Sequence, residues 1–123
     1  MIFDHVSLSV SDLARSRTFF SEALAPLAIG VAMEFPEAIG LGREGRPQLW
    51  LASDGNPSSP LHLAFTAANR AEVDAFHHAA LLAGGADNGA PGLRPHYHAD
   101  YYAAFVIGPD GHNVEAVCHQ KPA

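Results

Sequence analysis

The chain has 123 residues, 48% of them hydrophobic, and its 13 acidic and 7 basic residues give a formal charge of −6. This length fits one domain with a packed core, and no run of Lys or Arg offers a surface for nucleic acid or an anionic membrane. No apolar segment reaches the roughly 20 residues of a membrane span. The N-terminus lacks a signal-peptide pattern and Cys118 is the one cysteine, so we expect a cytoplasmic protein without disulfides.

The first half of the chain predicts one strand, one helix and three further strands. Apolar and polar residues alternate over residues 6–10, which is the period of a half-buried strand. His5 has the parity of the polar face. Ser11 or Asp12 can cap the following helix, and Pro26 ends it. The three further strands are expected at about residues 27–35, 38–42 and 48–53.

The second half repeats this order. His62 lies 57 positions after His5, and the same shift places Asn69 on Asp12 as the cap of a second helix. The residue pairs that also match are Ala14 and Ala71, Phe19 and Phe76, Ala23 and Ala80, and Leu24 and Leu81. Strands are expected at about residues 62–67, 86–93, 101–108 and 113–119. The sequence therefore predicts two βαβββ modules, at 1–53 and 61–119, joined by a linker at 54–60 within one domain of 1–123.

Three segments resemble the vicinal oxygen chelate superfamily, which comprises glyoxalases, bleomycin-resistance proteins and extradiol dioxygenases. They are residues 4–20, which contain DHVSLSVSDL and RTFF, residues 62–65 (HLAF) and residues 110–115 (DGHNVE). The resemblance implies an α+β fold in which the two tandem modules form a curved eight-stranded sheet around a cleft. Members are commonly homodimers, so the cleft is completed either within one subunit or across two.

The resemblance also implies a set of metal ligands. By position, His5 and His62 match the ligands on the first strand of each module, and Glu115 matches the carboxylate on the last strand. The family's fourth ligand position falls near Trp50 or Gln48, where lactoylglutathione lyases carry a glutamate. This departure argues against true glyoxalase activity.

Two imidazoles and one carboxylate can bind one divalent ion, such as Fe, Mn, Zn, Ni or Co, and leave positions open for substrate. Such an ion polarises adjacent substrate oxygens and stabilises an enediolate or a catecholate. We therefore expect a metal-dependent lyase, isomerase or dioxygenase acting on a small molecule with vicinal oxygens. The alternative is a metal-free protein of the bleomycin-resistance type that binds a drug or metabolite. Each ligand also has the ordinary alternative of a polar side chain on the exposed face of a strand.

A further cluster of polar and aromatic residues, at 96–102 (HYHADYY), leads into the seventh strand. The candidates for acid–base catalysis are Glu115 and three residues of this cluster, His98, Tyr101 and Tyr102. The candidates for contact with substrate are Gln48, Trp50 and His96. The alternative for the cluster is a polar loop followed by aromatic residues that pack the sheet, and Trp50 is either a stacking surface or part of the core.

Overall fold

The computed structural model describes residues 3–53, 56–57 and 59–122, so positions 54, 55 and 58 of the predicted linker lie outside the described residues. The first half consists of β1 (Val6–Ser9), α1 (Leu13–Leu24), the 3-10 turn η1 (Ala25–Leu27), β2 (Gly30–Phe35), β3 (Ala38–Gly42) and β4 (Leu49–Ala52). The second half consists of β5 (His62–Thr66), α2 (Arg70–Leu82), β6 (Ala86–Leu93), β7 (Tyr102–Ile107), the 3-10 turn η2 (Pro109–Gly111) and β8 (Asn113–Cys118). The predicted order of elements is confirmed.

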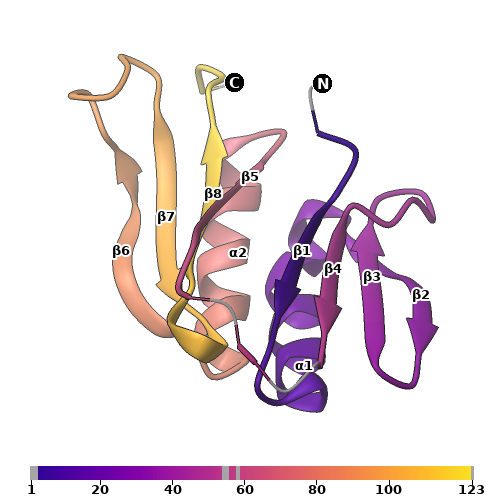
Figure 1. The fold of residues 1–123 in the computed structure, drawn as a ribbon. Coiled ribbons are helices and arrows are strands. Elements are labelled where there is room, and N and C mark those ends of the chain that lie inside the picture. The colour runs from indigo at the N-terminus through magenta and orange to yellow at the C-terminus, as the bar shows by residue number, and fades with distance from the viewer. Residues whose placement is uncertain (1–2, 54–55, 58, 123) are drawn as a thin grey trace.

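The strands form two four-stranded sheets of the same topology, ordered β1-β4-β3-β2 and β5-β8-β7-β6. In each sheet the first strand pairs in parallel with the last, and the remaining pairs are antiparallel. Figure 1 shows the sheets side by side, with β1 and β5 at the centre and the two helices behind them. The chain is thus an α+β protein of two βαβββ modules.

Both helices begin where the sequence places their caps. The side chain of Asp12 accepts a hydrogen bond from the backbone N–H of Arg15 at 3.0 Å. Asn69 accepts from the N–H of Glu72 at 2.9 Å, and Glu72 in turn accepts from the N–H of Ala68. These side chains satisfy backbone donors that a helix leaves free in its first turn.

Alternation along the strands separates a core-facing side from an open side. Leu8 and Val10 of the first module and Val114, Ala116 and Cys118 of the second lie in one hydrophobic core with the helices. Cys118 is buried there as a free thiol, which agrees with its parity opposite to Glu115. Residues of the opposite parity, which include Glu115 of β8, lie on the other face of each sheet, which we call the open side.

The modules meet mainly through α1 and α2. A second link joins Ser11 to Asp110, whose carboxylate accepts from the Ser11 hydroxyl at 2.6 Å and from its backbone N–H at 3.1 Å. No helix in the described part of the chain is long and apolar enough to cross a membrane.

One predicted boundary is wrong. The second strand was expected from Leu27, but residues 25–27 form a 3-10 turn and the strand begins at Gly30. Pro26 occupies the start of this turn, and Ala28 closes it in the left-handed region with φ at 61°. The proline fixes a helical φ at that point, which delays the extended backbone by one turn.

Candidate functional site

Glu115 is the buried acid of the second sheet. It lies on β8, pairs with Ala64 of β5 and Phe105 of β7, and is 1% exposed. Burying a carboxylate is costly unless polar groups compensate for the lost water. Here both oxygens have a partner: Oε1 lies 2.7 Å from Nε2 of His62, and Oε2 accepts a hydrogen bond from the hydroxyl of Tyr101.

His62 connects this buried acid to solvent. It begins β5, and its side chain is 54% exposed although its ring contacts Phe105 at 6.0 Å between centroids. Nε2 of His62 and Oε1 of Glu115 lie within hydrogen-bond distance, and the tautomer of the imidazole sets which atom donates. The pair therefore presents one imidazole and one carboxylate on the open side of the second sheet.

Tyr101 holds the other oxygen of Glu115 from the loop before β7. Burial, together with its hydrogen bond to Glu115, raises the pKa of Tyr101 to about 12. The phenol consequently stays protonated at neutral pH and acts as a fixed hydrogen-bond donor. Tyr101 thereby positions the carboxylate toward His62.

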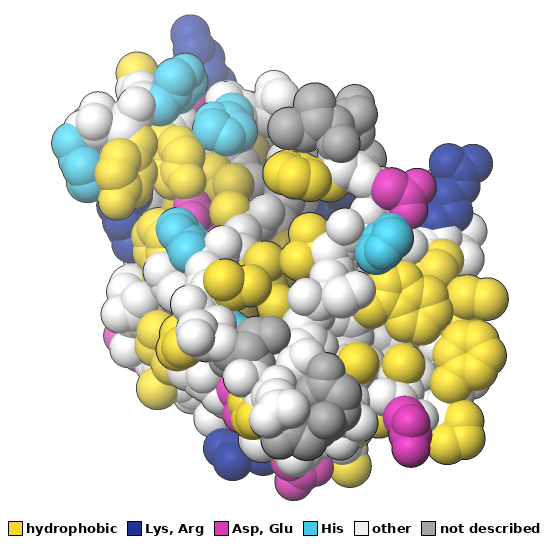
Figure 2. Space-filling model, viewed as in Figure 1, with side chains coloured by type: hydrophobic (Ala, Val, Ile, Leu, Met, Phe, Trp, Pro, Cys, Tyr) yellow, Lys and Arg dark blue, Asp and Glu magenta, His cyan; other side chains and the backbone are white. Residues whose placement is uncertain are grey.

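The predicted cluster at 96–102 surrounds Tyr101 with rings. Tyr97 and His119 each contact the Tyr101 ring, at 5.1 and 5.2 Å between centroids, and His98 lies 5.6 Å from His119. The ring of His96 is tilted against that of Tyr97, with centroids 4.2 Å apart. Figure 2 shows histidine and hydrophobic side chains gathered at the upper left, over the loop between β6 and β7. The ring cluster, defined as residues 96, 97, 98, 101 and 119, borders the Glu115 carboxylate through Tyr101.

Tyr102 points to the opposite side of the sheet from Tyr101. Its hydroxyl donates to Asp74 of α2 at 2.6 Å, and the guanidinium of Arg70 lies over its ring at 5.1 Å. The hydrogen bond to Asp74 raises the pKa of the Tyr102 phenol. Because successive strand residues face opposite ways, Tyr102 is separated from the Glu115 carboxylate and ties β7 to the helix.

His5 lies apart from the His62–Glu115 pair. It precedes β1 in the first sheet, its side chain is 51% exposed, and its Nδ1 lies 2.8 Å from the carboxylate of Asp4. Within residues 3–53, 56–57 and 59–122, no three His, Cys, Asp or Glu side chains lie close enough together to hold a metal ion. A single chain therefore brings together two of the three predicted ligands.

Trp50 occupies the first-module position that corresponds to Glu115. Glu115 pairs with the residue two places after His62, and Trp50 pairs with Ser7, two places after His5. The Trp50 ring lies above Gly40, where an added Cβ would be 3.0 Å from two of its ring carbons, and it stacks on Phe35 with centroids 6.2 Å apart. An aromatic surface thus replaces the carboxylate. Gln48 lies before β4 and lines a separate cavity between the modules.

The sequence matches the model of the Glyoxalase/Bleomycin resistance protein/Dioxygenase superfamily over residues 2–116. The chain belongs to this superfamily. A search of curated proteins finds no match.

Solved structures of this superfamily share the fold. A glyoxalase/bleomycin resistance protein from Albidiferax ferrireducens T118 is 27% identical, with a TM-score of 0.82 over 96% of this chain and 98% of that one. A glyoxalase-related enzyme from Fulvimarina pelagi is 21% identical, with a TM-score of 0.73 over 96% and 87% of the two chains. A lactoylglutathione lyase from Agrobacterium tumefaciens is 18% identical, with a TM-score of 0.70 over 96% and 92%.

Proteins of this superfamily commonly bind a metal, and the residues present fit part of such a site. His62 and Glu115 offer a nitrogen and an oxygen 2.7 Å apart, the donor types that suit Zn, Fe, Mn, Ni or Co. A third donor has to come from outside this pair, since His5 lies elsewhere in the same chain.

The sequence missed one member of the ring cluster. His119 is exposed near the C-terminal end of the chain, and its ring contacts Tyr101 and His98. Its parity with Glu115 and Val117 along the last strand was the available signal.

Proposed function

We propose that the chain is a divalent-metal-dependent enzyme of its superfamily that acts on a small molecule with vicinal oxygens. His62 and Glu115 would bind the metal, and the third ligand would be His5 of a second copy in a homodimer. The observation that carries this proposal is the buried Glu115 carboxylate, held 2.7 Å from His62 on the open side of the sheet.

A second copy can supply the missing donor. His5 is half exposed at the start of the edge strand β1, so its imidazole is accessible to a neighbouring molecule. In a dimer with a twofold axis, each copy would give His5 to its partner and receive one in return. Two equivalent three-ligand sites would result, each with positions open for substrate.

A bound metal ion would polarise the two adjacent oxygens of the substrate. Residues of the chain would position the carboxylate ligand and the substrate for that reaction. Tyr101, protonated at neutral pH, keeps one carboxylate oxygen of Glu115 occupied and leaves the other toward His62. His98 is a candidate for moving a proton, because its Nδ1 accepts from the backbone of Asp100 and its Nε2 remains available. Trp50 of the partner would give a flat apolar surface to the substrate.

A metal-free binding protein is the second candidate. Both oxygens of Glu115 already have protein partners, so the carboxylate is satisfied without a metal. In that case the open side of the sheet would bind a metabolite or drug through the rings around Tyr101.

Elemental analysis of the untagged protein tests the proposal. We expect near-stoichiometric divalent metal in the parent, a loss in Glu115→Gln, and retention in the matched control Glu37→Gln, whose side chain is exposed on the first module. Light scattering on the same samples should show a dimer. If the parent takes up none of the five metals and remains a monomer, the metal-dependent proposal fails and the binding protein takes its place.

A further inference from the structure

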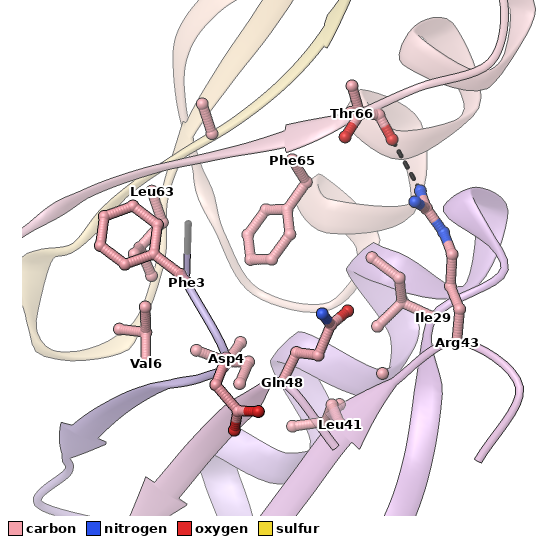
Figure 3. Close-up of a pocket in the computed structure, with 13 residues that line it drawn as sticks. Phe3, Asp4, Val6, Ile29, Leu41, Arg43, Gln48, Leu63, Phe65 and Thr66 are labelled. Carbon is pink, nitrogen blue, oxygen red and sulfur yellow. Dashed lines mark hydrogen bonds between the residues drawn. The ribbon is translucent and has the colours of Figure 1, made fainter. Parts of the chain in front are cut away.

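A cavity of about 230 Å³ opens between the two modules, and neither His62 nor Glu115 lines it. Figure 3 shows its residues converging from the start of β1, from β3 and β4, and from β5. Leu63 and Phe65 form its wall on the second module. They alternate along β5 with His62, so they leave the strand on the opposite face. Ala64 and Thr66, which have the parity of His62, also border the cavity, whereas His62 and Glu115 do not line it. The cavity is therefore a neighbouring site with a lining of its own.

The cavity is mainly apolar. Ile29 and Leu41 are buried at its base, whereas Val6, Leu63 and Phe65 are half-buried and remain in contact with water. An apolar ligand would remove this surface from water, which is favourable by roughly 25 cal/mol per Å². Pockets that hold drug-sized molecules measure about 300–1,000 Å³, so this smaller cavity fits a smaller ligand.

A positive charge lies at the rim. Arg43 donates from Nε to the carbonyl of Leu27 at 2.8 Å and from Nη2 to the carbonyl of Thr66 at 2.7 Å, the contact drawn in Figure 3. A guanidinium has five N–H donors, so donors remain. Across the described residues, no carboxylate lies within ion-pair distance of Arg43. The nearby acid of the lining, Asp4, is already paired with His5.

We propose that this cavity binds a small carboxylate with an apolar body. The carboxylate would meet the remaining donors of Arg43, and the body would lie between Leu63 and Phe65 on one module and Ile29 and Leu41 on the other. The charge of Arg43 excludes an amine at that position and favours an anion over a neutral head group. This assignment is independent of metal binding at Glu115.

Hexanoate and 1-hexanol, followed through the methyl NMR signals of Ile29, Leu41 and Leu63, test the proposal. Both probes should bind with saturable shifts of these methyls below roughly 20 mM, the range expected for so few atoms. Hexanoate should bind about three- to fivefold more tightly than hexanol, the benefit of an exposed ion pair. Raising the salt from about 0.05 to 0.5 M should remove that advantage.

Variants locate the site. Arg43→Gln should abolish the preference for hexanoate, while the control Arg46→Gln, with its exposed side chain outside the cavity, should keep it. Leu63→Phe should weaken both probes, and the same exchange at the exposed Leu82 should weaken neither. Glu115→Gln should leave hexanoate binding unchanged whatever its effect on metal.

Three results would overturn the assignment. If hexanoate leaves the three methyl groups unperturbed, the cavity is no ligand site. If the two probes bind equally and salt has no effect, the carboxylate assignment is wrong. This salt comparison uses the parent protein, so it holds even where Arg43→Gln fails to fold. If Glu115→Gln abolishes hexanoate binding, the ligand belongs to the other site.

Discussion

The hydroxyl of Tyr101 donates to Oε2 of Glu115, the carboxylate oxygen that His62 leaves free. The pairing spans 14 positions and joins the loop before β7 to the middle of β8. An acid that is 1% exposed therefore has a protein partner at each oxygen. Substitution of Tyr101, Ser11, His112 or Gly40 disturbs one contact of the folded chain in each case, and each effect can be measured.

Tyr101→Phe should destabilise the protein. The substitution removes one donor from a buried carboxylate, and an unsatisfied buried acceptor costs about 1–3 kcal/mol. Urea denaturation at neutral pH measures this loss in the free energy of unfolding. Tyr97→Phe is the matched control, because Tyr97 is exposed and keeps its ring contacts after the exchange. Equal stability of the two variants would contradict the role given to the Tyr101 hydroxyl.

Ser11→Ala should weaken the link between the modules, by about 0.5–1.5 kcal/mol for the lost hydrogen bond. The hydroxyl of Ser11 lowers the pKa of Asp110 below its ordinary value. A lowered folded-state pKa stabilises the fold above the unfolded pKa, and this contribution is lost as pH falls through the folded pKa. Ser11→Ala should therefore narrow the stability difference between neutral pH and about pH 3. Ser53→Ala, which is exposed, should leave that difference as in the parent.

His112 should make the fold sensitive to mild acid. It is fully buried, its Nδ1 accepts from the N–H of Leu61 at 3.0 Å, and burial lowers its pKa. The unfolded chain binds the proton first as pH falls below about 6.5, so stability is complete above that value and declines below it. The slope for one proton is at most about 1.4 kcal/mol per pH unit. Urea denaturation between neutral pH and about pH 5 should show a shallower decline in His112→Gln than in the parent.

Gly40→Ala should displace Trp50. An added Cβ would lie 2.7 Å from Cβ of Pro47 and 3.0 Å from the Trp50 ring, and such crowding costs about 1–3 kcal/mol. The tryptophan fluorescence of the folded protein should change together with its stability. At Gly30 an added Cβ meets nothing within 4 Å, so Gly30→Ala is the control. An unchanged spectrum in Gly40→Ala would contradict the packing of Trp50.

The sequence predicted the fold well because its signals are local. The caps Asp12 and Asn69 and the alternating strands each act within one module, and the repeat at a shift of 57 positions relates the two modules. They also imply that the modules share one topology, which the two sheet orders confirm. The late start of β2 reflects Pro26, whose turn the strand pattern did not reveal.

The site depends on strand register, which alternation alone leaves undetermined. That His62 meets Glu115 follows from the parallel pairing of β5 with β8. Tyr101 and Tyr102 are neighbours in the sequence and were equivalent candidates there, but in the structure Tyr101 bonds Glu115 and Tyr102 bonds Asp74 of α2. The metal role of His5, His62 and Glu115 stays a prediction. Of the residues that line the cavity near Arg43, Gln48 alone was a candidate from the sequence, because the lining extends from Phe3 to Thr66 and forms only when the modules meet.

Strand β5 lies at the edge of its sheet and pairs with β8 alone among the described strands. The register of β5 against β8 therefore decides on which face of the sheet each side chain of β5 lies. A slip of one residue would place Leu63 on the face of Glu115 and turn His62 toward the core, because side chains alternate with a period of two. The pairing of His62 with Asn113 therefore decides that the imidazole, and not the Leu63 side chain, faces the Glu115 carboxylate.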